Sequence, residues 1–188
     1  MDCKQTVVKV DIDGVIRNLP DSMCRVYNME FDRCMTSSEI TTYDVREMFS
    51  DIHNPVDFFF TGKNAKELFF DSLPYAGAIE ALHKLRDNGY KIALVTWQID
   101  TQNKKYTLDW LDKWCVPYDD ICFTRDKYMI HGDYLIDDNP EFLEDERERS
   151  VKIQIRRPYN TYLEPKYRCV DDLTSAIESV LNDNELPF

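Results

Sequence analysis

The chain has 188 residues, of which 43% are hydrophobic and only five are glycine, as in a folded domain with a full core. Its 23 basic and 35 acidic side chains give a net charge of −12, which argues against duplex nucleic acid as a partner. Six scattered cysteines form no Cys-x-x-Cys pair, so a zinc or redox motif is unsupported. The start lacks the apolar core of a signal peptide, and no 18-residue apolar run follows. We therefore expect a cytoplasmic protein without a membrane span.

The first predicted strand lies in the apolar run 7–16 and brings Asp11 and Asp13 to its end, followed by Gly14. Glycine permits a tight turn there. Two interpretations fit the carboxylates: a hydrated turn, or a pair that binds a divalent cation and a phosphate. Taken alone, the pair favours the turn, but motifs further along the chain reverse that preference.

Residues 17–73 are mainly helical by pattern, and they interrupt the strand–helix order of the rest of the chain. This block is too long for one crossover and too short for an independent domain. We expect a small helical cap, inserted after strand 1 and lying above the strand ends, on a core of residues 1–16 and 74–188. The candidate helices are Met23–Tyr27, Val45–Phe49 and Ala65–Phe70.

From Pro74 onward, strand-like and helix-like stretches alternate. The predicted strands are 91–96, 120–123, 134–136 and 151–155, and the predicted helices are 76–88, 104–114, 140–149 and 171–181. In helix 104–114, we expect Leu108, Leu111 and Trp114 to face inward. The alternation predicts an α/β fold with a parallel sheet and helices on both faces.

Ligands of such sheets bind at the carboxyl ends of the strands. Three predicted strands end in chemically useful residues, namely Asp11, Thr96 and Asp137. We therefore expect these residues to share one site.

Four motifs in order resemble those of the haloacid dehalogenase superfamily of phosphotransferases: Asp11–Ile–Asp–Gly–Val, Thr96, Lys127, and Gly132–Asp–Tyr–Leu–Ile–Asp137–Asp138. They span about two-thirds of the chain. More narrowly, FTRDKYMIHGDYLIDD and FFDSLPYAGAIEAL resemble segments of the 5′(3′)-deoxyribonucleotidases. The resemblance implies a Rossmann-like core with a cap.

The resemblance also implies the roles of the motif residues. Asp11 would be the nucleophile that forms an aspartyl-phosphate, and Asp13 would act as general acid and base. Thr96 and the backbone amide of Trp97 would bind the phosphoryl oxygens, and Lys127 would pair with the nucleophile and the phosphate.

The implied cofactor is Mg²⁺, which neutralises the charge of a phosphate monoester. Its ligands would be Asp11, the backbone carbonyl of Asp13, and Asp138, with Asp137 ordering its water shell. Which of Asp137 and Asp138 binds directly stays open.

Each motif residue also has a structural interpretation. Thr96 fits a simple strand end, Lys127 a solvated surface position, and one of Asp137 and Asp138 a helix cap before Pro140. The joint occurrence of all four motifs favours the functional interpretation.

The substrate pocket is less well defined by the sequence. Tyr43, Phe58, Phe59 and Phe60 are candidates for an aromatic wall, although three adjacent phenylalanines more often form core. Arg156 begins a basic, aromatic-rich patch that extends to residue 168, which is either an exposed loop or an anion-attracting rim.

Three residues depart from the deoxyribonucleotidase pattern. Trp97 and Gln98 stand where those enzymes have a small residue and proline, and Asn18 where they often have an acid. Base and sugar preference therefore stay open, as does the oligomeric state.

The predicted function is a Mg²⁺-dependent phosphomonoesterase, a 5′(3′)-(deoxy)ribonucleotidase that hydrolyses nucleoside monophosphates through an aspartyl-phosphate. One alternative keeps the chemistry and changes the substrate to a small metabolite or a nucleic-acid 3′ end. A second alternative is a non-catalytic nucleotide-binding or protein-interaction module.

Overall fold

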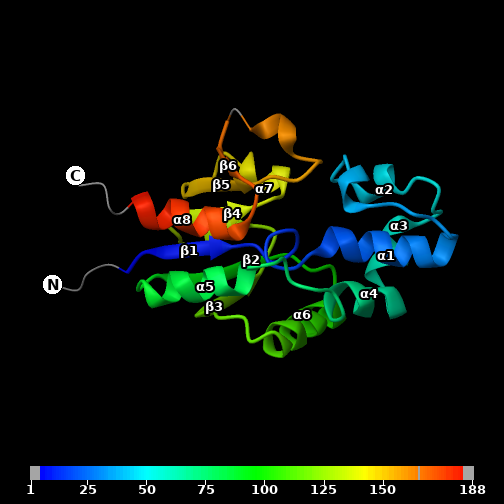
Figure 1. The fold of residues 1–188 in the computed structure, drawn as a ribbon, viewed down its shortest axis with the longest axis horizontal. Helices are drawn as coiled ribbons and strands as arrows, with labels where there is room; N and C mark the ends of the chain where they lie inside the picture. The colour runs from blue at the N-terminus through cyan, green and yellow to red at the C-terminus, as the bar shows by residue number, and fades with distance from the viewer. Residues whose placement is uncertain (1–4, 165, 184–188) are drawn as a thin grey trace.

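A six-stranded, all-parallel sheet with β1 and β4 at its centre organises the structure, a computed structural model that describes residues 5–164 and 166–183 (Figure 1). The strand order is β3-β2-β1-β4-β5-β6. The strands are β1 (Val7–Val10), β2 (Lys91–Thr96), β3 (Asp120–Phe123), β4 (Tyr134–Asp137), β5 (Val151–Ile155) and β6 (Arg168–Val170). The α/β prediction is confirmed, and β6 is an additional short edge strand.

Eight α-helices are described. They are α1 (Leu19–Phe31), α2 (Val45–Met48), α3 (Pro55–Phe60), α4 (Gly62–Phe69), α5 (Ala78–Asp87), α6 (Thr101–Lys113), α7 (Pro140–Leu143) and α8 (Leu173–Asp183). Short 3₁₀ helices are η1 (Ser37–Glu39), η2 (Lys127–Met129) and η3 (Thr161–Leu163).

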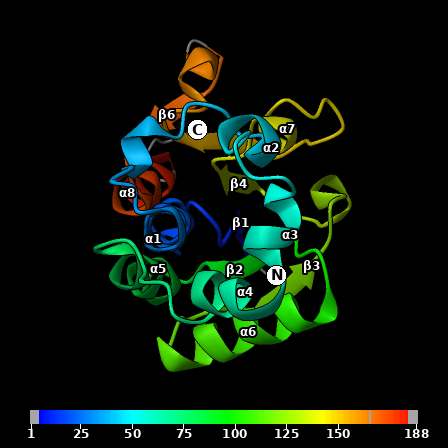
Figure 2. The same cartoon turned by 90° about the vertical axis from the view of Figure 1, so that its right-hand side faces the viewer.

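The two faces of the sheet differ in what they bury. Because successive side chains of a strand point to opposite faces, Val8 and Val10 join one hydrophobic cluster while Lys9 points away from it. Helices α5, α6 and α8 contribute to that cluster through residues such as Leu85, Trp110 and Ile177. In Figure 2, α5 and α8 lie on one side of the strands and α7 on the other.

Helices α1 to α4 lie beyond the carboxyl ends of the strands (Figures 1 and 2). This inserted helical segment, residues 17–73, has its own apolar cluster, which includes Met23, Phe49, Phe59 and Leu68. The three predicted helices overlap α1, α2 and α4, whereas α3 was not predicted.

The chain enters and leaves the helical segment at one place. The amide of Asn18 donates to the carbonyl of Leu73 at 2.9 Å, and the amide of Tyr75 donates to that of Ile16 at 2.8 Å. Between these bonds, Arg17 and Pro74 form an isolated antiparallel bridge. The two connections are thus hydrogen-bonded to each other.

Two helix predictions need correction. Leu108 is 41% exposed, because the inward stripe of α6 consists of Asn103, Thr107, Trp110 and Leu111. Because Asn103 and Thr107 are polar, a search for apolar residues at helical spacing does not find this buried face. The helix predicted over 140–149 ends at Leu143, and Glu148 turns into the interior instead.

Within the described residues, no helix is long and apolar enough to cross a membrane. The five cysteines that the structure describes are free thiols.

Candidate active site

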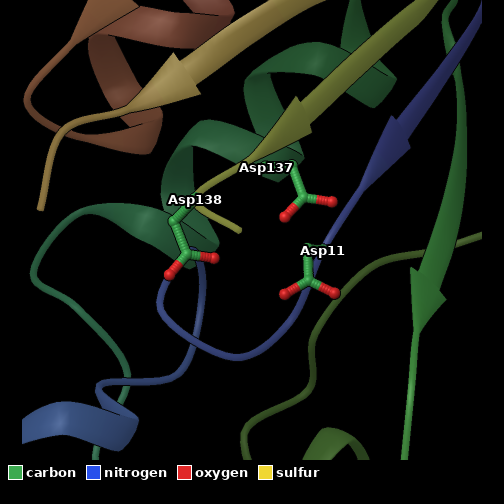
Figure 3. A group of neighbouring side chains, drawn as sticks. All are labelled: Asp11, Asp137 and Asp138. Carbon is green, nitrogen blue, oxygen red and sulfur yellow. The ribbon is translucent and has the colours of Figure 1, made fainter. Parts of the chain in front are cut away.

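Three buried carboxylates meet at the carboxyl ends of the two central strands. Asp11 follows β1, Asp137 ends β4, and Asp138 comes next. One oxygen of each lies within 4.8 Å of one oxygen of both others (Figure 3). The amide of Asp11 donates to the carbonyl of Ile136 at 3.0 Å, which keeps the two strand ends together.

Lys127 is the cation of this cluster. Its Nζ donates to Asp11 Oδ1 and to Asp137 Oδ2, at 2.7 Å in both cases, and the side chain is buried. Burial alone lowers the pKa of a lysine, but the charges of Asp11 and Asp137 outweigh it and raise the pKa of Lys127. The ammonium is therefore charged at neutral pH.

Lys127 cannot neutralise the three carboxylates when all of them are ionised. In that form, one ammonium against three carboxylates leaves two negative charges. Burial raises the pKa of Asp11 well above its usual value, and burial followed by the charge of Asp137 raises the pKa of Asp138 to about 7. A divalent cation with a preference for carboxylate oxygen, such as Mg²⁺, fits this donor set.

Gly14 closes the turn after Asp13 and has no acceptable substitute. Its φ is +79°, a value that favours glycine, and a Cβ at this position would lie 2.1 Å from Oδ2 of Asp138. Hence both the turn and the approach of Asp138 to the Asp11 loop require glycine.

Asp13 lies beside the cluster and borders the adjoining cavity. Its Oδ1 accepts from Nε of Arg17 at 2.7 Å, and its Oδ2 accepts from Nε2 of Gln98 at 2.8 Å. Thr96, which ends β2, and Trp97 also border the cavity. The structure thus brings the predicted catalytic, phosphate-binding and metal-binding residues to one edge of the sheet.

The loop after β5 holds Asp138 in place. The sequence analysis singled out this loop as an exposed loop or an anion-attracting rim, but did not predict its contacts with Asp138. The hydroxyl of Tyr159 donates to Oδ2 of Asp138, and Nδ2 of Asn160 donates to its backbone carbonyl at 2.7 Å. Arg157 donates twice to the carbonyl of Gly14, at 2.9 and 2.6 Å. The position of this loop after a predicted parallel strand was a usable signal, since β5 ends at the same edge as β4.

Asn139, not Asp137 or Asp138, caps α7. Its Oδ1 accepts from the amide of Glu141 at 2.9 Å, as an N-cap side chain does. The helix-cap interpretation of the two aspartates is therefore wrong.

A cavity of about 760 Å³ separates the carboxylates from the helical segment. Its apolar lining comes from both parts of the molecule and includes Met23, Met48, Phe49, Phe60, Phe69 and Trp97. Tyr43 also borders the cavity, and its hydroxyl accepts from Nδ2 of Asn139 at 2.8 Å.

Two of the candidate pocket residues lie elsewhere. Phe59 is fully buried and Phe58 packs beside it in the cluster of the helical segment, and neither borders the cavity. Consecutive residues of a helix point in different directions, so of the three only Phe60 turns toward the site.

The proposed basic rim is also corrected. Arg156 does not border the cavity, because its guanidinium pairs with Glu164 at 2.7 Å and with Asp171. Lys166 pairs with Glu144, and Arg168 with Asp183, each at 2.6 Å. Acidic neighbours thus pair with Arg156, Lys166 and Arg168, whereas Arg157 donates to backbone carbonyls.

Solved structures share this fold. A "predicted phosphatase" from Clostridium acetobutylicum superimposes with a TM-score of 0.61 at 15% identity, over 95% of this chain and 99% of that one. The D,D-heptose 1,7-bisphosphate phosphatase of B. bronchiseptica, complexed with magnesium and phosphate, gives a TM-score of 0.54 at 12% identity, over 95% and 99%. At such low identities, these similarities establish the fold alone.

Sequence similarity narrows the assignment. A curated protein of Chlorobaculum tepidum, described as "Putative 5'(3')-deoxyribonucleotidase", is 28% identical over 144 residues, which cover 72% of this chain and 70% of that protein. Residues 5–181 match the family described as "5' nucleotidase, deoxy (Pyrimidine), cytosolic type C protein". The chain therefore belongs to this 5′-nucleotidase family of phosphatases, within the haloacid dehalogenase fold.

Proposed function

We propose that the protein is a Mg²⁺-dependent phosphatase that hydrolyses nucleoside monophosphates through an aspartyl-phosphate on Asp11. One observation carries this proposal. Lys127 bridges Asp11 and Asp137 in a buried carboxylate cluster beside a cavity of about 760 Å³. Such a site places an ammonium beside an anionic nucleophile and offers carboxylate oxygens to a divalent cation, and the two cations together would supply the positive charge that a phosphate dianion needs for its approach.

In the first step, an oxygen of Asp11 attacks the phosphorus, and the bond from phosphorus to the leaving alcohol oxygen breaks. Asp13, in its protonated form, gives its proton to that oxygen, so a neutral nucleoside leaves. Thr96 and the amide of Trp97 hold the phosphoryl oxygens, and Lys127 balances the charge that remains on the phosphoryl group.

In the second step, water attacks the phosphorus of the aspartyl-phosphate. Asp13, now ionised, accepts a proton from this water, and the bond between phosphorus and the oxygen of Asp11 breaks. Inorganic phosphate leaves, and both carboxyl groups return to their starting forms.

Asp11, Asp138 and the backbone carbonyl of Asp13 would hold the metal ion, with Asp137 hydrogen-bonded to its water shell. When bound, Mg²⁺ neutralises phosphate charge and aligns the phosphoryl group with the nucleophile. The excess of three carboxyl groups over the single ammonium of Lys127 supports this assignment.

Residues 17–73 would act as a cap over a core of residues 1–16 and 74–188. Aromatic side chains such as Phe60 and Trp97 suit the flat face of a base. The names of the family and of the curated relative favour deoxynucleotides, and the family description favours the cytoplasm. The ion pairs of Arg156, Lys166 and Arg168 with acidic neighbours disfavour a nucleic-acid 3′ end as the substrate.

Phosphate release from a panel of ribo- and deoxynucleoside monophosphates, sugar phosphates and a 3′-phosphorylated oligonucleotide tests the proposal. We expect Mg²⁺-dependent hydrolysis of the mononucleotides, with deoxy forms slightly favoured. A clear preference for a sugar phosphate or for the oligonucleotide would reject this substrate class. Binding of a nucleotide without any phosphate release would favour the non-catalytic alternative.

A further inference from the structure

Arg17 is a fully buried cation at the junction between the sheet and the helical segment. Its guanidinium carbon lies 5.1 Å from the ring centroids of both Phe69 and Trp110. A buried charge is costly unless it is paired and hydrogen-bonded. Within the described part of the chain, its one ion pair is with Asp13.

The side chain of Arg17 donates hydrogen bonds to the loop after β1, to α4 and to α6. Nε donates to Oδ1 of Asp13 at 2.7 Å, and Nη1 donates to the carbonyl of Phe69 at 2.7 Å. Nη2 donates to Oγ1 of Thr107 in α6 at 3.1 Å. Because the guanidinium is planar and rigid, three bonds from its three nitrogens fix its orientation.

The backbone of Arg17 is fixed as well. Its amide donates to the carbonyl of Ile12 at 2.8 Å, its carbonyl accepts from the amide of Gly14 at 2.9 Å, and it is bridged to Pro74. Arg17 is therefore tied to the Asp11–Gly14 loop, to both connections of the helical segment, and to the end of α4.

We propose that Arg17 is the positioning residue for Asp13, holding its carboxyl group toward the leaving-group oxygen and tying that orientation to the end of the helical segment at Phe69. This inference rests on the proposed function, in which Asp13 protonates the leaving alcohol. Gln98 holds the other oxygen of Asp13, but each carboxylate oxygen has a second lone-pair site, so the carboxyl group can still reach a substrate.

The test compares two leaving groups. A nucleoside leaves as an alcohol that needs a proton, whereas p-nitrophenolate leaves without one, so misalignment of Asp13 should affect only the first. The value of kcat/KM reports the steps up to leaving-group departure, before water attacks. We expect Arg17→Met to lower kcat/KM for a nucleoside monophosphate by about 10²-fold, and that for p-nitrophenyl phosphate by less than about 5-fold.

Thr107→Val is the matched control. It removes one hydrogen bond of Arg17 and leaves the bond to Asp13, so a lower melting temperature with a wild-type ratio of the two kcat/KM values is expected. Arg17→Lys keeps the charge with a single donor group, and should recover about tenfold of the activity on the nucleotide relative to Arg17→Met.

Parallel losses on both substrates in Arg17→Met, or no loss, would overturn the inference, as would the same selective loss in Thr107→Val. If Arg17→Met does not fold, Arg17→Lys decides: selective loss on the nucleotide supports the positioning role, and parallel loss refutes it. A wild-type protein that hydrolyses neither substrate would instead refute the proposed function, and this inference with it.

Discussion

The edge of the sheet and the helical segment bury different kinds of side chain. The sheet and its loops bury the charged residues Lys9, Asp11, Lys127, Asp137, Asp138 and Glu148. Residues 18–73, all of which the structure describes, bury no charged side chain, and their ion pair between Arg25 and Glu67 is exposed at the surface. Arg17, the first residue of the helical segment, is the exception, and it is buried where the segment joins the sheet.

This difference indicates that the two regions have different roles. Electrostatic interactions between buried charges are strong because the local dielectric constant is low, and the partners of these charges hold them rigidly. Stabilisation of a reacting phosphate requires both properties. Apolar and aromatic walls adjust affinity and shape instead. Substitutions at the sheet edge should therefore abolish turnover or stability, whereas substitutions in the helical segment should mainly change substrate affinity.

Removing the nucleophile has the largest expected effect. Asp11→Asn should lower phosphate release by at least about 10³-fold, because the amide does not attack phosphorus. Its melting temperature should not fall, because burial raises the pKa of Asp11 and the neutral amide relieves that cost. Asp145→Asn, outside the cavity, is the control. Residual turnover within tenfold of wild type would remove Asp11 from the mechanism.

Breaking the buried ion pair of the core comes next. Nζ of Lys9 lies 2.5 Å from Oε2 of Glu148 and also donates to the carbonyl of Lys127 at 3.3 Å. Glu148→Gln should lower the free energy of unfolding by about 3 kcal/mol in urea titrations, because it leaves a buried cation unpaired. Glu144→Gln, which breaks the exposed pair with Lys166, should cost less than about 0.5 kcal/mol. Equal losses of unfolding free energy in Glu148→Gln and Glu144→Gln would contradict the difference between the buried and the exposed ion pair.

The same pair has a pH signature. Burial raises the pKa of Glu148, but hydrogen bonds from Lys9 and Ser150 outweigh it, so the pKa lies below its usual 4.5. The stability from this lowered pKa is present above pH 4.5 and is lost as the pH falls through the folded-state value. The difference between wild type and Glu148→Gln should therefore shrink below pH 4.5.

Metal removal should have an intermediate effect. In metal-free protein, the pKa of Asp138 is raised from 3.8 to about 7. Between pH 3.8 and about 7, Asp138 is therefore protonated in the folded state and ionised in the unfolded state. Stability should fall as the pH rises through this window. Mg²⁺ should raise the melting temperature by about 2–4 °C at pH 8 and less at pH 5. If Mg²⁺ raises the melting temperature of Asp138→Asn by the same amount as that of the wild type, Asp138 is not a ligand of the metal ion.

The smallest effect is expected in the helical segment. Tyr43→Phe removes the hydrogen bond that joins the helical segment to Asn139 beside the cavity, so this part of the cavity wall should be held less firmly. KM for a nucleotide should rise by less than about 5-fold, with kcat within about 2-fold. Tyr118→Phe, remote from the cavity, should leave both constants unchanged. A tenfold loss of kcat at constant KM would show that the helical segment takes part in the chemistry.

The sequence by itself determined where the chemical groups would meet. Apolar runs end at Asp11, Thr96 and Asp137, and strands of a parallel sheet deliver their carboxyl ends to one edge. Spacing along the chain was enough for this, because the direction of a parallel strand does not depend on which side chains pack around it.

Only the tertiary structure decided which charges are buried and what holds them. Arg17, Glu148 and Tyr159 look like ordinary surface residues in the sequence, yet they contact Asp13, Lys9 and Asp138 respectively. Likewise, the buried face of α6 was not predicted because it contains the polar residues Thr107 and Asn103. The physical reason is that burial of a polar group depends on partners distant in the sequence, such as Thr107 for Arg17, 90 residues away, and Lys9 for Glu148, 139 residues away. A local pattern does not contain those partners.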